Sequence, residues 1–478
     1  MIQDLVRPRE EVLKEGIEGR VDVYKAVIKE GIESDPERFL DITFLTEPLK
    51  EVFGEINKKF KPEKGARFGV YTFSGGYGSG KSHHLLALFH TLNSPEIGKN
   101  WLLSNGLSYT IPENTISILI QALSIDPDYL WEPIFEGLGR DDVQVKRVPT
   151  HEQIKEALDK EHVVIFLDEI ESWFEGLDSD TQRQRNLNFL QNLTEVASDS
   201  GSNLVVFISL LGISDDIKGV VNRSDSYWIN LYGIKDRDKI VFYRLFHTED
   251  KERHKDGIKT VIDQYISAYK KAGIFRDRSV RTQKRIEDLK NKMFESYPFH
   301  PQVIETLFEK YGASRTYQRT RGILYLLSSV VQDLYDKKDL IILSDIDPEK
   351  YDEFSKLESE LSEKAIIDIR KTSEIGIKYA KPILSTIFIK SIASGTSRGA
   401  SREDILFGVI YPSINVNDID SAITELGNTA PHLNQIEGKY FIQLEENILV
   451  LIENEARQLK DKTIVSEKLA EIIKNEIK

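Results

Sequence analysis

The sequence contains no cysteine among its 478 residues. A chain without cysteine can form neither a disulfide framework nor a thiolate metal site, and it is compatible with a reducing cytoplasm. A zinc site would have to depend on nine scattered histidines.

Long apolar runs are also absent. No stretch approaches the roughly 20 apolar residues that a membrane-spanning helix needs. The first residues, MIQDLVRPREEV, lack the basic and apolar regions of a signal peptide. We therefore expect a cytoplasmic protein with no membrane partner.

Positive charge is in deficit as well, with a formal net charge of −14. This charge argues against a protein that binds nucleic acid over its whole surface. The densest basic segment is FRDRSVRTQKRIEDLKNK, residues 275–292. Because acids are interspersed in it, a solvated helix face is its default interpretation, and a local contact with DNA is the alternative.

Glycines gather in FSGGYGSGKSHHLL, residues 73–86, between a short apolar run and a leucine-rich stretch with helical spacing. The segment contains G-x-x-x-x-G-K-[ST], the Walker A pattern of a phosphate loop. In such a loop backbone N–H groups bind phosphates, Lys81 reaches the outer phosphates, and the Ser82 hydroxyl suits Mg²⁺. We therefore predict ATP and Mg²⁺ as cofactors. The candidate residues are Gly75, Gly76, Gly78, Ser79, Gly80, Lys81 and Ser82.

A second signal is HVVIFLDEIESWF, residues 162–174, an apolar run that ends in two acids. The run predicts a central parallel strand with carboxylates at its carboxyl end, where ligands of open α/β sheets bind. Asp168 is then placed to hold Mg²⁺ through water, and Glu169 to act as general base. Solvated acids at an ordinary strand end are the alternative for this pattern alone. Together with the phosphate loop it is a Walker B motif and predicts ATP hydrolysis.

Two further candidates follow the acidic pair along the chain. Ser209 lies near the end of the apolar run 203–212 and could contact the γ-phosphate or the attacking water, or could be a core serine. Arg223 precedes a fifth strand expected at 226–232. There it could act across a subunit boundary in a homo-oligomer, with a surface arginine as the alternative.

A further arginine is expected in a helical lid. Arg321 precedes an apolar helix face within residues 314–334, so it could point into the nucleotide cleft. Arg315 and Arg319 compete with it for this role.

Six segments carry a family resemblance: DPERFLDITFLTEPLKEVF, SGGYGSGKSHHLLALFH, LDEIESW, SYPFHPQVIETL, QRTRGILYLL, and the stretch from STIFIKSI to GKYFIQLEENI. Through these six segments the chain resembles AAA+ ATPases of the origin-recognition group and, more narrowly, the domain-of-unknown-function 499 family. The resemblance implies an ATPase that works beside DNA methyltransferases or other proteins of phage-defence systems. It also adds His83, which matches a position where the family tends to have histidine.

Two departures from the family are visible. The family loop usually ends closer to G-G-G-K, whereas here Gly78, Ser79 and Gly80 precede Lys81, which leaves phosphate binding intact. Family members are also generally longer, so this chain resembles their N-terminal half.

The expected fold is α/β: a P-loop NTPase (AAA+) core with a parallel sheet, a helical lid and a C-terminal winged-helix domain. We predict an N-terminal helical segment (1–60), the core (61–235), the lid (236–345), a charged linker (346–375), the winged helix (376–456) and a C-terminal helix (457–478). Its third helix carries Asp418, Asp420 and Glu425 and no cation. We therefore expect this domain to contact protein rather than DNA.

Overall fold

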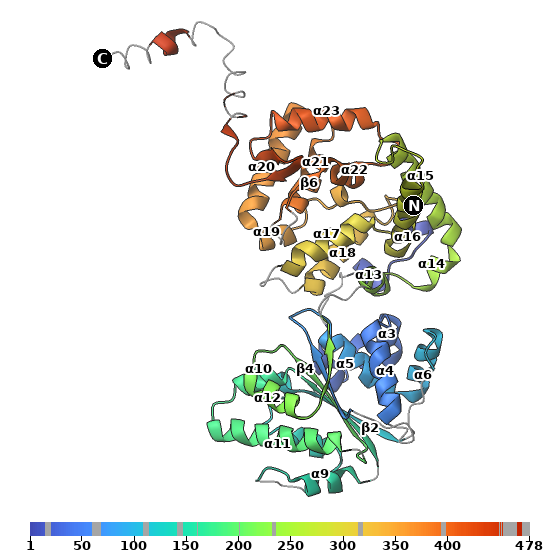
Figure 1. Ribbon diagram of the computed structural model, residues 1–478, viewed down its shortest axis with the longest axis vertical. Coiled ribbons are helices and arrows are strands. Elements are labelled where there is room, and N and C mark those ends of the chain that lie inside the picture. Colours follow the sequence, from blue (N-terminus) through green and yellow to red (C-terminus); the bar gives the residue numbers. More distant parts are fainter. Residues whose placement is uncertain are drawn as a thin grey trace. The chain divides into compact units, whose positions relative to one another are not determined.

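The computed structural model describes residues 1–14, 21–59, 68–108, 114–140, 147–159, 161–199, 201–231, 236–313, 319–392 and 398–448, with a few residues after 449. The chain forms two compact units. We call residues 19–244 the sheet unit, and residues 1–18 with 245–478 the helical unit (Figure 1).

A five-stranded parallel sheet forms the centre of the sheet unit. Its strands are β1 (Val70–Ser74), β2 (Thr115–Gln121), β3 (His162–Asp168), β4 (Leu204–Leu210) and β5 (Tyr227–Asn230), in the order β2-β3-β4-β1-β5. β3 and β4 are apolar along almost their whole length because both faces of the sheet are covered. The carboxyl ends of β3 and β1 flank that of β4, so the loops after these strands lie at one edge.

Helices cover both faces of the sheet. Alternate residues of β3 separate the two cores, with Val164 and Phe166 in one and Val163, Ile165 and Leu167 in the other. The helices that contribute to the first core are α3 (Pro36–Asp41), α4 (Glu47–Lys59), α5 (Lys81–Asn93) and α6 (Pro95–Ser104). Those of the second are α8 (Trp131–Gly137), α9 (His151–Leu158), α10 (Ile170–Glu175), α11 (Asp180–Ser198) and α12 (Asp215–Arg223) (Figure 1). The predicted α/β fold with a parallel sheet is confirmed.

Helices dominate the helical unit, beginning with α14 (Glu249–Arg253), α15 (Lys255–Lys271), α16 (Val280–Ser296), α17 (Pro301–Ala313) and α18 (Arg319–Leu334). The start of the chain belongs here: Ile2 donates its N–H to the Lys338 carbonyl at 2.8 Å, and Arg7 pairs with Asp250 at 2.8 Å. Ile2, Val6 and Val12 are fully buried. This differs from the predicted single segment 1–60, because apolar residues of the first turns pack against helices more than 200 residues away.

The C-terminal part of the helical unit combines three helices with a small antiparallel sheet. The elements are α21 (Ala380–Ser391), β6 (Ala400–Ser401), α22 (Arg402–Val409), α23 (Val416–Gly427), β7 (Leu433–Ile436) and β8 (Lys439–Ile442), and the sheet order is β6-β8-β7. Ser401 caps α22 by accepting the N–H of Asp404. The order of elements is the one expected for a winged helix, whose assignment stays a prediction.

Residues 346–375, for which we predict a charged helical connector, are helical but pack more closely than a linker. They contain α19 (Glu353–Leu357) and α20 (Ser359–Ile375), and α20 buries Leu361, Ala365 and Ile369. The buried carboxylate of Asp368 accepts the backbone N–H of His432 at 3.0 Å and bonds its ring Nδ1 at 2.7 Å. α20 is therefore packed into the C-terminal part. The predicted C-terminal helix 457–478 lies mostly outside the described residues.

Within the described ranges, no helix is both long enough and apolar enough to cross a bilayer.

Candidate nucleotide-hydrolysis site

The phosphate loop connects β1 to α5 and depends on its glycines. Gly78 and Gly80 have φ angles of 70° and 92°, in the left-handed region that favours glycine. A Cβ atom on Gly75 would lie 2.3 Å from Ser79 Oγ. A side chain at position 75 would therefore collide with Ser79. The loop leads directly into the first turn of α5, where backbone N–H groups have no partner within the helix.

Lys81 is the first residue of α5 and is 9% exposed. Its ammonium donates to the carbonyls of Gly75 at 2.8 Å and Gly76 at 3.0 Å. The Lys81 ammonium therefore lies inside the loop, where phosphate oxygens of a nucleotide would also bind. This arrangement fits a nucleotide: an anion in the loop would meet a buried cation and the positive end of a helix dipole.

Asp168 ends β3 and meets the phosphate loop. Its carboxylate is 2% exposed and accepts the hydroxyl of Ser209, and the Ser82 side chain lies close enough to lower its pKa. Burial raises the pKa of Asp168 above its ordinary value, against the opposing effect of both hydroxyls and of Lys81. A nearby divalent cation would favour the charged carboxylate, and one carboxylate with a hydroxyl suits Mg²⁺, which keeps several waters.

Ser209 therefore bonds Asp168, and the prediction that it contacts the γ-phosphate or water stays open. Among the described residues, no group of three His, Cys, Asp or Glu side chains is placed to hold a metal ion. A metal here would depend on Ser82, Asp168, water and phosphate oxygens.

Glu169 follows Asp168 with a φ of 53°, a left-handed backbone conformation that costs an acidic residue of order 1 kcal/mol. Its carboxylate accepts a hydrogen bond from the amide of Gln121, the last residue of β2. Gln121 is 3% exposed and lies opposite Asp168 in the β2·β3 register. Sequence reasoning missed Gln121, although a polar residue at the carboxyl end of an apolar strand was a usable signal.

Glu171 is a second residue that sequence reasoning missed. It is 2% exposed, and its carboxylate accepts the backbone N–H groups of Leu211, Gly212 at 3.0 Å and Ser214 at 3.1 Å. These bonds fix the loop that follows Ser209. Glu171 thereby positions the end of β4 beside the acidic pair.

Two consecutive histidines attach the phosphate loop to the α3–α4 region. His83 Nε2 bonds the Thr43 hydroxyl at 2.9 Å. His84 Nδ1 lies 2.8 Å from the Gly80 carbonyl, and His84 Nε2 lies 3.0 Å from the Thr46 hydroxyl. Because a carbonyl only accepts, Nδ1 must carry the proton and Nε2 accepts from Thr46. Burial lowers the pKa of His84 to about 4.

The role of His83 in nucleotide binding stays a prediction. Its ring contacts Thr43 and packs against Phe39, with ring centroids 4.8 Å apart. Burial and the neighbouring Arg244 lower the pKa of His83 well below its ordinary value.

Arg223 lies far from its own phosphate loop. It is exposed at the end of α12, three residues before Ser226, whose hydroxyl bonds the carbonyl of Val70 at 3.3 Å. Val70 begins β1 and the phosphate loop follows its end, so Arg223 lies at the opposite edge of the sheet. The two edges are separated by roughly 15 Å, the length of a five-residue strand.

The candidate lid arginines fall at or before the start of α18. Arg321 lies in α18, but its side chain is outside the described residues, as is Arg315 altogether. The choice among Arg315, Arg319 and Arg321 stays a prediction.

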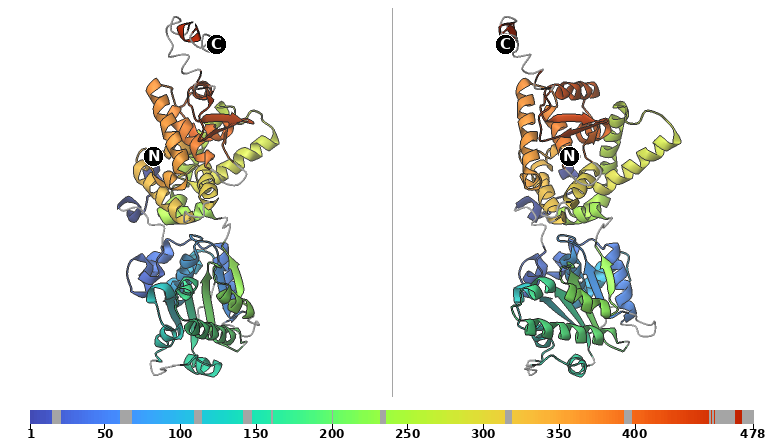
Figure 2. Two further views of the ribbon diagram at one scale, coloured as in Figure 1. Left: turned by 90° about the vertical axis from the view of Figure 1, so that its left-hand side faces the viewer. Right: turned by 60° about the vertical axis from the view of Figure 1, so that its left-hand side comes forward.

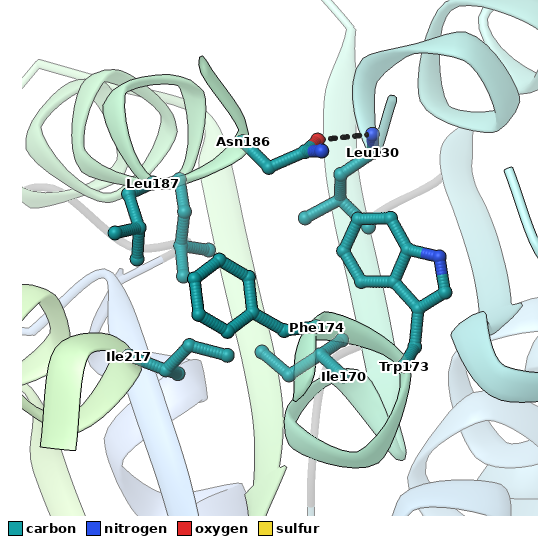
Figure 3. Close-up of a pocket in the computed structure, with 8 residues that line it drawn as sticks. Leu130, Ile170, Trp173, Phe174, Asn186, Leu187 and Ile217 are labelled. Carbon is teal, nitrogen blue, oxygen red and sulfur yellow. Dashed lines mark hydrogen bonds between the residues drawn. The ribbon is translucent and has the colours of Figure 1, made fainter. Parts of the chain in front are cut away.

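An apolar pocket lies behind the acidic motif (Figure 3). It is lined by Ile170, Trp173 and Phe174 of α10, with Leu130, Asn186, Leu187, Leu190 and Ile217 around them. Its volume of about 10 Å³ is close to that of a single water, so we assign it to core packing rather than to a ligand.

Comparisons with known proteins place these features in a family. The family model described as "DUF499 N-terminal domain" matches residues 2–125, and the one described as "DUF499 second domain" matches residues 234–441. No curated protein matches the chain.

Two solved structures show a weak likeness. The Orc1 protein of Aeropyrum pernix, in complex with DNA, is 14% identical with a TM-score of 0.33, covering 86% of this chain and 92% of that one. Cdc6p from Pyrobaculum aerophilum is 11% identical with a TM-score of 0.34, covering 86% and 93%.

Proposed function

The chain belongs to the DUF499 family, and from this premise we propose that it is a Mg²⁺-dependent AAA+ ATPase. In this proposal ATP binding and hydrolysis drive the assembly or remodelling of a DNA-modification or anti-phage defence complex. One observation carries the enzymatic part: Ser82, Lys81 and Asp168 meet at one sheet edge, and the strained Glu169 is the next residue. The complex it serves is inferred from the family resemblance.

Each residue has a chemical role in this proposal. The loop N–H groups and Lys81 bind the phosphates, and Ser82 and Asp168 hold Mg²⁺, which supplies neutralisation of phosphate charge when bound. Glu169 accepts the proton of the water that attacks the terminal phosphorus. ATP and water thereby become ADP and inorganic phosphate. Ser209 and Glu171 keep the acidic pair and its neighbouring loop in position.

The position of Arg223 supports a homo-oligomer. At the edge opposite its own phosphate loop, its guanidinium can neutralise transition-state charge only in the site of a second copy. We propose this role for Arg223. A DNA methyltransferase or another defence protein is the proposed further partner.

A second candidate function, a slowly hydrolysing nucleotide-gated switch or scaffold, is favoured by Gln121. Its amide occupies the Glu169 carboxylate that would otherwise accept a proton from water. As long as this bond persists, the general base is engaged. Release by a partner would then start hydrolysis.

An ATPase assay separates the two candidates. With Mg²⁺ and excess ATP, the remodelling ATPase should turn over many times, and Lys81→Ala should lower ATP affinity roughly 10- to 100-fold through loss of a charged hydrogen-bonding group. For the switch, turnover should be negligible, and Gln121→Ala should raise it severalfold. If the natural chain and Gln121→Ala both fail to bind and to hydrolyse ATP, both functions are wrong.

A further inference from the structure

The connection between α15 and α16 concentrates positive charge. Residues 270–285 hold seven cationic side chains and one carboxylate, a net charge of +6 within a chain of net charge −14. We call these residues the basic turn. All seven cations are exposed, and the hairpin of α15 and α16 stands out from the rest of the helical unit in both views of Figure 2. They are Lys270, Lys271, Arg276, Arg278, Arg281, Lys284 and Arg285.

Six of the seven cations pair with no carboxylate among the described residues. Arg285 pairs with Glu403, whereas the other six form no ion pair with any residue that the structure describes. The one carboxylate, Asp277, accepts the backbone N–H of Ser279 at 2.9 Å and stays close to its own backbone. Farther along α16 the pattern changes, because Lys290 pairs with Asp263 at 2.7 Å and Lys292 with Glu305 at 2.8 Å.

This uneven pairing has an energetic meaning. Like charges one turn apart on a helix, such as Arg281 and Lys284, destabilise it by a few tenths of a kcal/mol per pair. No stabilising contact offsets this repulsion in the described part of the chain, where none of the six cations bonds another helix or strand. A polyanion bound at the basic turn would relieve this repulsion.

The chemistry of the turn favours duplex DNA over other polyanions. Its aromatic residue, Phe275, is 8% exposed, so the turn offers no stacking platform for single-stranded bases. Val280, 87% exposed, is its one strongly exposed apolar residue, too little for a protein interface core or a membrane face. The Arg285 guanidinium lies over the buried Phe275 ring, 5.5 Å from its centroid, so this ring already has a partner within the turn. Exposed arginines and lysines suit the phosphates of a regular backbone.

We propose that the basic turn binds the phosphate backbone of duplex DNA without sequence preference. This inference deepens the proposed function by naming the surface that meets DNA. DNA binding at the basic turn requires no nucleotide. The DNA proposal can therefore be wrong while the protein still hydrolyses ATP, and it can be right if the protein hydrolyses none.

The test uses the full chain, a labelled 30-base-pair duplex and fluorescence anisotropy, without ATP, over a series of salt concentrations. The variant Arg278→Gln/Arg281→Gln/Lys284→Gln removes three unpaired cations. Each phosphate contact contributes about 0.9 to the slope of log K against log salt, so we expect the slope to fall by roughly 3 and affinity at low salt to drop at least tenfold.

The control variant Lys290→Gln/Lys292→Gln/Lys356→Gln changes the net charge equally but removes lysines that already have partners. It should bind duplex within about threefold of the natural chain. Circular dichroism and ATP turnover are measured for both variants to check that they fold like the natural chain.

Three outcomes would overturn the proposal. The first is an unchanged slope in the test variant, and the second is equal loss in the control. The third is tighter binding of a single strand or of polyglutamate than of the duplex.

Discussion

The buried ring of His84 makes the sheet unit sensitive to acid. Its neutral form donates to the Gly80 carbonyl and accepts from Thr46, and the protonated ring would lose the second bond. Burial lowers the folded-state pKa from 6.5 to about 4. Between about pH 6.5 and pH 4 His84 is therefore protonated in the unfolded chain but neutral in the folded chain. The free energy of unfolding falls as the pH decreases through this range.

The size of the effect follows from the pKa difference. One pKa unit corresponds to about 1.4 kcal/mol, so complete protonation would remove about 3 kcal/mol from the free energy of unfolding. Between pH 7.5 and pH 5 the His84 contribution is about 2 kcal/mol, because most unfolded chains but few folded ones are protonated at pH 5.

Tryptophan fluorescence isolates this effect. All four tryptophans, Trp101, Trp131, Trp173 and Trp228, lie in the sheet unit with His84. Denaturant unfolding at pH 7.5 and pH 5 should show a pH-dependent loss of stability about 2 kcal/mol smaller in His84→Gln than in the natural chain. Exchanging the exposed His151 for glutamine should leave the loss unchanged. If His84→Gln keeps the full pH dependence, His84 is not a buried neutral clamp on the phosphate loop.

Two further predictions concern the site and its assembly. Asp168→Asn should shift the Mg²⁺ concentration needed for half-maximal ATP turnover upward by tenfold or more, and an unchanged Mg²⁺ titration would remove Asp168 from the metal site. Arg223→Ala should lower turnover about 10³-fold and regain part of it when mixed with Glu169→Gln protein, because some mixed interfaces combine two intact halves; absence of rescue in assemblies shown to be mixed would make Arg223 a surface residue.

The predictions of the phosphate loop and the acidic pair depend on local patterns alone. Gly75, Gly80 and Lys81 belong to a single turn, and Asp168 ends a single strand, so no long-range contact was needed to select them. Gln121 needed more, because its bond to Glu169 depends on the register of β2 against β3. His84 likewise bonds Thr46, 38 residues earlier, through the packing of α5 against the start of α4.

The charges on α23 show more directly that the residues of one helix do not predict its ion pairs with other elements. Asp418 and Asp420 lie on a helix that has no cation of its own, but Asp418 pairs with Lys378 at 2.5 Å and Asp420 with Arg402 at 2.7 Å. Both cations come from outside α23, where the sequence gives no sign of contact. The acidic helix therefore repels DNA less than its own residues imply, although it still offers no cation of its own to a phosphate.

The role of Glu169 as the base is the central claim, and one comparison tests it most directly. ATP binding and ATP turnover should be measured with Mg²⁺ for the natural chain and for Glu169→Gln, which keeps the shape of the side chain and removes its basicity. We predict unchanged ATP affinity and turnover lowered by 10²- to 10⁴-fold. Turnover within threefold of the natural chain, or a loss of ATP binding equal to the loss of turnover, would contradict this account.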